Sequence, residues 1–184
     1  FAQTEMPALA HIFAGKSNLS VLDIGCNDGA KTVNRFSDAA VSKVLGLEYS
    51  DSLVAQANQT YENERFHFVQ LDVEQDDFPE KLAKLMIQSG IDSFDIIYLS
   101  FVLMHLQDAK KLLCRLHPFL KPNGQLFIIE TNDSASELKP DPDQLLPTFL
   151  TILKQDKYAG NRTIGENLSR LLAECRYDIL TVWS

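Results

Sequence analysis

The amino-acid sequence predicts an α/β fold: a doubly wound, mostly parallel sheet flanked by helices. Two observations predict this fold. Short apolar segments rich in β-branched residues alternate along the chain with segments whose apolar residues recur at helical spacing. Strands separated by helices form parallel sheets through right-handed crossovers, which place helices on both faces. The length of 184 residues predicts one domain, residues 1–184, because roughly 150 residues is typical of a domain.

The first strand and the loop after it are the most informative stretch. The apolar segment 21–24 stops at Gly25, and three residues that tolerate tight turns lead to Gly29. This order predicts a strand, a loop and a helix, with backbone N–H groups directed at a ligand that the glycines allow to approach. Asp23 stands just before the glycines, where a carboxylate repels a pyrophosphate and attracts an ammonium or sulfonium group.

The remaining elements follow in order along the chain. A helix at 5–14 is expected to cover the core, with closure over a ligand as the alternative. Further helices are expected at 31–40, 51–61, 79–89 and 108–120, and further strands at 43–48, 66–71, 94–100 and 125–130. A turn at 121–124 precedes the fifth strand.

Beyond the fifth strand, a helical insertion is expected at about 137–165, between strands five and six. Its first helix spans 143–157, a second helix ends near Cys175, and the apolar residues of 178–183 predict the sixth strand. Since the chain begins with Phe1 rather than Met, we expect it to be the ordered part, or a cut piece, of something longer.

Composition argues against several classes of function. The formal net charge of −8 and the lack of a basic stripe disfavour a nucleic-acid partner. No apolar run reaches the roughly 20 residues that span a bilayer, and no signal peptide opens the chain, so we expect no membrane partner and a cytoplasmic location. Cys26, Cys114 and Cys175 share no metal-ligand spacing, so we expect reduced thiols and no metal site.

Acidic residues follow three of the first four predicted strands. Strand one ends at Asp23 and the glycine loop, strand two at Glu48, strand three at Asp72 and strand four at Ser100. Doubly wound sheets bind ligands beyond the carboxyl ends of their strands, at the point where the strand order reverses. We therefore expect a binding site lined by these residues.

Residues 19–130 resemble a class I S-adenosylmethionine-dependent methyltransferase of the type that acts on small molecules. The segments that carry the resemblance are the glycine-rich first motif at 23–29, the second-strand motif at 46–50, the adenine-side motif at 70–73, the fourth-strand region at 94–97 and 103–106, and the turn at 120–126. Asn27 and Asn123 stand where the family usually has glycine, and asparagine tolerates positive φ best among the other residues. The family's antiparallel last strand has no room before Ser184, so we expect that it is missing here, either because it lies outside this piece or because the fold is abbreviated.

The resemblance implies S-adenosylmethionine as the cofactor and S-adenosylhomocysteine as the product. The cofactor-binding residues that it implies are Asp23, Gly25, Cys26, Asn27, Gly29, Glu48, Tyr49, Asp72, Val73, Ser100 and Phe101. Asp23 would lie near the amino group of the methionine portion, directly or through water, and the backbone of the glycine loop would face the same portion. A plain capping role for Asp23 is the alternative.

The later strand ends supply the nucleoside contacts that the resemblance implies. Glu48 would accept hydrogen bonds from both ribose hydroxyls. Asp72 would accept one from the adenine amine beside the backbone N–H of Val73, and Tyr49 would lie against the purine. Each of these residues also has a plainer interpretation, as an ordinary strand-end acid or a packing side chain.

The resemblance further implies a direct displacement that moves the methyl group to a small-molecule acceptor, close to Ser100 and Phe101. Insertions after the fifth strand roof the acceptor site in similar methyltransferases, so Tyr158 and Arg162 are candidate acceptor contacts, with packing or surface pairing as the alternative. His105 is a candidate catalytic base or a structural histidine. The chain lacks the Asn/Asp-Pro-Pro-Tyr/Phe motif of amino-methylating nucleic-acid enzymes and a Pro-Cys nucleophile pair, which favours a small molecule.

Two other interpretations stay open. A nicotinamide-dependent dehydrogenase on a similar sheet also has an acid about 20 residues beyond its glycines. It predicts Gly-x-Gly-x-x-Gly, which residues 25–29 do not match. A non-catalytic nucleoside-binding domain of a larger protein would keep the fold and fits the missing last strand, although the retained acids argue against a loss of binding.

Overall fold

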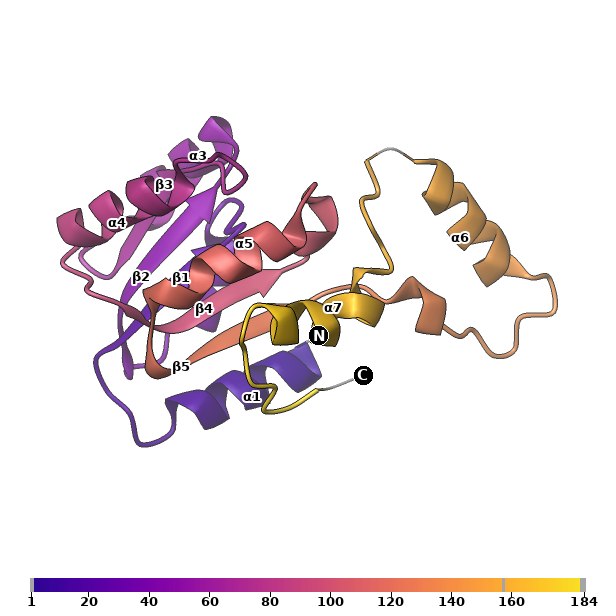
Figure 1. Ribbon diagram of the computed structural model, residues 1–184, viewed down its shortest axis with the longest axis horizontal. Helices are drawn as coiled ribbons and strands as arrows, with labels where there is room; N and C mark the ends of the chain where they lie inside the picture. Colours follow the sequence, from indigo (N-terminus) through magenta and orange to yellow (C-terminus); the bar gives the residue numbers. More distant parts are fainter. Residues whose placement is uncertain (1, 157, 183–184) are drawn as a thin grey trace.

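The computed structural model describes residues 2–156 and 158–182, and its centre is a five-stranded sheet in the order β3-β2-β1-β4-β5 (Figure 1). The strands are β1 (Leu19–Ile24), β2 (Val41–Glu48), β3 (Phe66–Gln70), β4 (Phe94–Ser100) and β5 (Leu120–Ile129). Neighbouring strands pair in parallel throughout. The strand order reverses between β1 and β4, so the carboxyl ends of these two strands flank the crevice where such sheets bind ligands.

Helices cover both faces of the sheet. Those on one face are α1 (Ala2–Phe13), α2 (Ala30–Arg35) and α3 (Asp51–Tyr61), and those on the other are α4 (Phe78–Gln88), α5 (Ala109–Leu116) and α7 (Ile164–Glu174). All six residues of β1 are buried, so its apolar residues do not alternate with exposed polar ones; its two polar residues, Ser20 and Asp23, are buried as well. The predicted doubly wound fold is confirmed.

α6 (Leu145–Gln155) belongs to neither layer. Figure 1 shows it projecting away from the sheet, beyond the carboxyl end of β5, and it has no buried residue. Short 3-10 helices lie at η1 (Leu103–His105), η2 (His117–Phe119) and η3 (Asp133–Ala135). Within residues 2–156 and 158–182, no helix combines the length and apolar character needed to cross a membrane.

Two of the helices that cover the sheet are shorter than the sequence predicts, as is α6, which spans Leu145–Gln155 within the predicted 143–157. α2 ends at Arg35 rather than at residue 40, because the side chains of Arg65 and Asp38 bond to the backbone of the next five residues and form a turn there. α5 ends at Leu116 rather than at residue 120, and the 3-10 turn η2 follows. Pro118 has no backbone N–H, so it cannot continue the hydrogen-bonding of the helix.

The turn predicted at 121–124 forms, but it lies within β5 rather than before it. Asn123 has a φ of 65°, in the left-handed region that asparagine tolerates. The register of β5 against β4 shifts between Phe94 and Ile96, as in a β-bulge. A Cβ on Gly124 would lie 2.9 Å from the carbonyl oxygens of Lys121 and Phe94, so this bulge requires glycine.

The predicted sixth strand is wrong for the residues that the structure describes. Residues 178–182 have no regular structure, and Trp183 of that prediction lies outside the described chain, as does Lys157 at the end of the predicted 143–157 helix. The chain leaves α7 through Arg176, at a φ of 65°, and the Tyr177 hydroxyl donates to the Leu113 carbonyl of α5 at 2.9 Å. This contact holds the chain against α5 instead of against the free edge of β5, so the helices after β5 are not an insertion between two strands.

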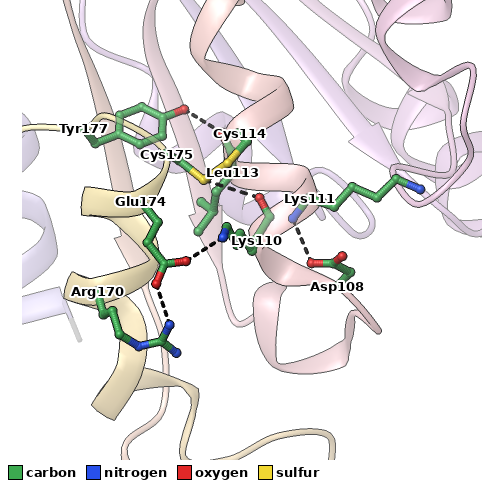
Figure 2. The surroundings of a disulfide bond; sticks show 9 residues. All are labelled: Asp108, Lys110, Lys111, Leu113, Cys114, Arg170, Glu174, Cys175 and Tyr177. Atoms are coloured by element: carbon green, nitrogen blue, oxygen red, sulfur yellow. Dashed lines mark hydrogen bonds and ion pairs between the residues drawn. A yellow bond between two sulfur atoms is a disulfide. The ribbon is translucent and has the colours of Figure 1, made fainter.

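The expectation of three reduced thiols is also wrong. Cys114 of α5 forms a disulfide with Cys175, while Cys26 is free and buried. Figure 2 shows the bond between two neighbouring helices, with an ion pair between Lys110 and Glu174 (2.6 Å) beside it. α5 and α7 pack on the same face of the sheet and bring the two Cα atoms to 4.7 Å, a proximity that a sequence separation of 61 residues does not reveal.

Candidate active site

The glycine loop after β1 has the backbone geometry that the sequence predicts. Gly25, Asn27 and Gly29 have φ values of 75°, 53° and 80°, so every second residue is in the left-handed region. The Gly25 N–H donates to the Leu47 carbonyl at 2.8 Å, which ties the loop to β2. A Cβ on Gly25 would lie 2.5 Å from Cγ2 of Val102, so this position requires glycine both for its φ and for its surroundings.

Cys26 presents its backbone to the loop and keeps its sulfur inside. Burial raises the pKa of its thiol, and the nearby carboxylates of Asp23 and Glu48 raise that pKa further. A Cβ on Gly46 of β2 would lie 3.0 Å from the Cys26 sulfur, which shows how closely the loop packs on the strand. The thiol therefore stays protonated and is unsuited to nucleophilic chemistry.

Asp23 lies beneath the loop rather than at its surface. Its side chain is 1% exposed and accepts a hydrogen bond from the Thr32 hydroxyl of α2 at 2.5 Å. Burial raises the pKa of this carboxyl to about 6, against the opposing effects of Thr32 and Arg35. The carboxyl group is mostly ionised at neutral pH, so it is a buried negative charge beneath the glycine loop.

A buried polar cluster that the sequence analysis missed surrounds Asp23. Glu5 of α1 accepts hydrogen bonds from Arg35 Nε and, at 2.5 Å, from the Tyr98 hydroxyl, and the Arg35 guanidinium lies 4.8 Å from the centroid of the Tyr98 ring. These contacts tie α1 to α2 and β4, so α1 covers the core. The available signal was Tyr98 itself, because a tyrosine in a buried apolar strand needs a polar partner.

Glu48, the last residue of β2, is held in place by backbone N–H groups. Its Oε2 accepts from the Asn27 N–H at 3.1 Å, and its Oε1 accepts from the N–H groups of Tyr49 (2.9 Å) and Ser50 (3.0 Å). The side chain is half-buried at the carboxyl end of β2. The structure thus joins the glycine loop and the acid at the end of β2, which the sequence separates by about twenty positions.

The residues predicted on the adenine side lie at the next strand end. Asp72 and Val73 are half-buried just after β3. Oδ1 of Asp72 accepts from the Glu74 N–H at 2.9 Å, and Oδ2 accepts from the Gln75 side chain at 2.8 Å. Tyr49 is 70% exposed. Asp72 and Val73 thus follow β3, the strand that pairs with β2, and Tyr49 directly follows Glu48.

A cavity of about 450 Å³ lies beyond the carboxyl ends of β4 and β5. The residues that line it are Phe101, Met104, His105, Thr131, Tyr158, Ala159 and Arg162. The structure thus brings together four residues that the sequence analysis selected from distant segments. Neither Met104 nor Thr131 was among them, because a methionine and a threonine carry no signal of a site in the sequence.

The segment between α6 and α7 closes one side of this cavity. The Asn161 N–H donates to the Met104 carbonyl at 2.6 Å, and the Gly165 N–H donates to the Thr131 carbonyl at 2.9 Å. A Cβ on Gly160 would clash with the Met104 carbonyl oxygen. These contacts hold the segment beside the cavity, and its predicted role as a roof over an acceptor stays a prediction.

The charged and polar residues of the cavity differ in their contacts and in their exposure to solvent. Arg162 lines the cavity, but its guanidinium donates to both carboxylate oxygens of Asp133, at 2.5 and 3.1 Å, which matches the surface-pairing alternative. His105 and Tyr158 are exposed at the cavity rim. Ser100 is half-buried at the end of β4. Within the described ranges, no group of three or more His, Cys, Asp or Glu side chains could hold a metal ion.

Glu130, the residue after β5, is a further acid at a strand end. Its Oε1 accepts from the N–H groups of Val102 (2.9 Å) and Leu103 (2.6 Å). Its Oε2 and the Thr131 hydroxyl are buried without a hydrogen-bond partner among the residues that the structure describes. Burial raises the pKa of Glu130, and the backbone hydrogen bonds oppose that rise. The strand-end rule that selected Glu48 and Asp72 would have found this residue.

Comparison with known proteins gives the family. Residues 22–126, more than half of the chain, match a family model described as "Methyltransferase domain". The chain belongs to this family. The match contains the glycine loop, Glu48, Asp72 and η1, and it confirms the predicted resemblance to class I methyltransferases.

This methyltransferase domain is similar to enzymes with different acceptors in their names. It is 34% identical over 109 residues to trans-aconitate 2-methyltransferase of Deinococcus radiodurans, with 59% of this chain and 36% of that protein covered. It is 30% identical over 139 residues to mRNA cap guanine-N(7) methyltransferase 2 of Oryza sativa subsp. japonica, with 73% and 39% covered. The chain spans less than half the length of each of these relatives.

A solved structure supports the same assignment. An S-adenosylmethionine-dependent methyltransferase from Mesorhizobium loti is similar to this methyltransferase domain with a TM-score of 0.53 and 25% identity, over 70% of this chain and 55% of that one. The parallel sheet with helices on both faces is thus the fold of the methyltransferase family.

Proposed function

We propose that this methyltransferase domain binds S-adenosylmethionine at the carboxyl ends of β1, β2 and β3 and methylates a small molecule in the cavity beyond β4 and β5. The hydrogen bond from the Asn27 N–H to Glu48 carries the proposal, because it joins the left-handed loop and a fixed carboxylate into one surface. The cavity lies beyond the ends of the two strands on the other side of the crevice.

The residues at the crevice fit this cofactor in their chemistry. Three backbone N–H groups fix the Glu48 carboxylate, and Oε2, which accepts only one of them, keeps a lone pair for a ribose hydroxyl. Binding of the second hydroxyl would require Oε1 to release one of its two N–H partners. A carboxylate that is already held in place loses little conformational freedom when it binds a ligand. The buried charge of Asp23 favours the ammonium group of a methionine portion above the glycine loop, and it disfavours a pyrophosphate.

The other residues implied by the family resemblance complete the proposed cofactor site. Asp72 and Val73 would bind the adenine edge, and the exposed Tyr49 ring would lie against its face. Ser100 and Phe101 follow the reversal point of the sheet and would lie beside the sulfonium and the methyl group. Gly25, Cys26, Asn27 and Gly29 would contribute backbone groups to the methionine portion.

A small-molecule acceptor is supported by the size of the cavity and by the charge of the chain. A volume of about 450 Å³ is in the range of small-molecule sites. The relative from Deinococcus radiodurans has a small molecule, trans-aconitate, in its name. The rice relative has an mRNA cap in its name, but a net charge of −8 disfavours nucleic-acid binding by this chain.

When bound, S-adenosylmethionine supplies an electrophilic methyl group on a sulfonium, which an acceptor atom displaces directly. The chain's own contribution is to align the acceptor and to exclude water, and the apolar side chains of Phe101 and Met104 line the cavity for both purposes. His105, which lines the cavity, would take a proton from an acceptor that must lose one. Tyr158 and the paired Arg162 would contact the acceptor from the wall between α6 and α7.

Calorimetric titration with S-adenosylmethionine and with NAD tests the proposal. We expect the wild type to bind S-adenosylmethionine and not NAD. Glu48→Ala should weaken S-adenosylmethionine at least about tenfold, since it removes a charged hydrogen-bond acceptor. Glu64→Ala is the matched control, because Glu64 is an exposed glutamate in the loop before β3, and its removal should leave the affinity unchanged.

Two results would contradict the proposal. Tight binding of NAD without any response to S-adenosylmethionine would favour a dehydrogenase. Binding of S-adenosylmethionine without transfer of a labelled methyl group to any acceptor in a broad small-molecule screen would favour a non-catalytic nucleoside-binding domain.

A further inference from the structure

The turn between β4 and η1, residues 101–104, touches both halves of the proposed site. Cγ2 of Val102 occupies the space where a side chain on Gly25 would lie, so the turn packs against the glycine loop. Phe101 and Met104 of the same turn line the cavity. A displacement of this turn would therefore alter the cofactor loop and the acceptor cavity together.

The backbone of this turn is in an unfavourable conformation that its surroundings must maintain. Phe101 has a φ of 57°, in the left-handed region that bulky side chains avoid. Three consecutive N–H groups are directed at the end of β5. That of Phe101 donates to the Ile129 carbonyl at 2.8 Å, and those of Val102 and Leu103 donate to Oε1 of Glu130. Consecutive N–H groups around a left-handed residue form an anion-binding nest, and the anion here is a side chain of the same protein.

We propose that Glu130 is a positioning residue whose carboxylate fills this nest and holds the 101–104 turn against the glycine loop and the cavity wall. The inference rests on the proposed function, because it assigns a role to the turn within that site. Glu130 does not line the cavity itself, so it acts through the turn.

The cost of burying this carboxylate supports a specific role. Oε2 of Glu130 is buried and has no partner among the described residues, and a half-satisfied buried carboxylate is unfavourable. An apolar side chain would fill the same space without that cost, but it would leave the N–H groups of Val102 and Leu103 unpaired. Burial raises the pKa of Glu130, as expected for a carboxyl retained in a poorly solvated position.

Titration of variants with S-adenosylmethionine, followed by calorimetry, tests this inference without knowledge of the acceptor. Glu130→Ala removes the acceptor oxygen and should weaken the affinity about tenfold, the effect of a lost charge-assisted hydrogen bond. Glu130→Gln keeps a side-chain oxygen that can accept from both N–H groups, so it should restore the affinity to within about threefold of the wild type. Glu130→Met replaces Glu130→Ala if the alanine variant does not fold, because it keeps the buried volume.

Ser20→Ala is the control for a general loss of stability. The Ser20 hydroxyl donates to the Ser93 carbonyl at 2.8 Å at the opposite end of the sheet, so the variant should lower the melting temperature and leave the affinity unchanged. Equal affinity of Glu130→Ala and wild type would overturn the inference, as would a Glu130→Gln variant as weak as Glu130→Ala. Failure of both Glu130→Ala and Glu130→Met to fold, with Ser20→Ala folded, would show a folding role instead. A wild type that does not bind S-adenosylmethionine would overturn the proposed function, a result distinct from these.

Discussion

The two sides of the proposed site are built in different ways. On the proposed cofactor side, at the ends of β1 and β2, backbone N–H groups of the glycine loop and of the residues after β2 hold the Glu48 carboxylate in place. On the acceptor side, side chains from the turn after β4, from the end of β5 and from the segment between α6 and α7 form the cavity. The first side follows from the fold, whereas the second depends on long-range contacts between side chains and loops.

Burial shows the same difference. Asp23 and the apolar residues of β1 and β2 belong to the core, while α6 buries no residue and exposes Leu145, Phe149 and Ile152. The acceptor side is held to the core by a small set of contacts, among them the Arg162–Asp133 pair and the Cys114–Cys175 disulfide. The proposed cofactor side thus rests on the buried sheet, whereas much of the proposed acceptor side is built outside the core.

The largest effect is expected from Gly25→Ala on the cofactor side. The added Cβ would collide with Val102, and the φ of 75° would be strained, so the affinity for S-adenosylmethionine should fall at least about a hundredfold. Gly15→Ala is the matched control, because Gly15 has a φ of 70° with open space around it. It should cost about 1 kcal/mol of stability and leave the affinity unchanged. Equal affinities of the two variants in calorimetry would contradict this prediction.

The next effect concerns the acceptor side. The double variant Cys114→Ser/Cys175→Ser, or reduction of the wild type, should lower the free energy of unfolding by about 2–4 kcal/mol, because the disulfide closes a loop of 61 residues. The affinity for S-adenosylmethionine should stay within about twofold, which is about 0.4 kcal/mol. Urea unfolding and calorimetry measure the two quantities, and a reductant should have no further effect on the double variant. A parallel loss of cofactor affinity would show that the two sides are not separable.

Asp23→Asn should stabilise the fold while weakening cofactor binding. Because burial raises the pKa of Asp23 from 3.8 to about 6, its ionised form costs up to about 3 kcal/mol of folding free energy above pH 6. Because the folded-state pKa is the higher one, the carboxyl carries no penalty below about pH 4; the penalty grows between the two pKa values, 3.8 and about 6, and stays constant above that. The gain in stability from Asp23→Asn should therefore be larger at pH 8 than at pH 5 in urea unfolding.

Asp95→Asn is the control of opposite sign for that experiment. Burial raises the pKa of Asp95, but hydrogen bonds from Lys121 and Ser20 lower it more, so the net pKa is below its ordinary value. Its contribution to stability is present above the unfolded-state pKa and is lost as the pH falls through the folded-state value. Asp95→Asn should thus destabilise the fold at pH 8. Stabilisation by both variants would point to a general effect of net charge.

The smallest effect is expected from Phe149→Ala in α6. Phe149 is 54% exposed, so its removal should change the free energy of unfolding by no more than about 0.5 kcal/mol. Phe78→Ala in α4 is the matched comparison, since both helices have 11 residues and Phe78 is fully buried. That variant should cost about 3–5 kcal/mol. A large loss for Phe149→Ala would show that α6 packs against something in solution.

The parts of the site that the sequence predicted are those set by local residues. Gly25, Asn27 and Gly29 specify their turn through their own φ preferences, and Glu48 marks a strand end that follows from the apolar run before it. The doubly wound sheet followed from alternating periodicity in the same way. In each case the residues that determine the local structure are neighbours in the sequence.

The features that the sequence did not predict depend on partners far apart in the chain. Glu5 meets Tyr98 across 93 positions, and Cys114 meets Cys175 across 61. The sixth strand failed because Tyr177 binds α5, and an apolar pattern forms a strand only beside a free sheet edge. Arg162 was a candidate acceptor contact with surface pairing as the alternative, and its partner, Asp133, was visible only in the fold.

A crystal structure with S-adenosylhomocysteine tests the central claim most directly. We predict that the nucleoside lies across the ends of β2 and β3 with its ribose hydroxyls on Glu48, and that the amino acid portion lies over the loop from Gly25 to Gly29. Density for the ligand elsewhere, or Glu48 still turned to the backbone N–H groups alone with no ligand contact, would contradict the assignment of this crevice as the cofactor site.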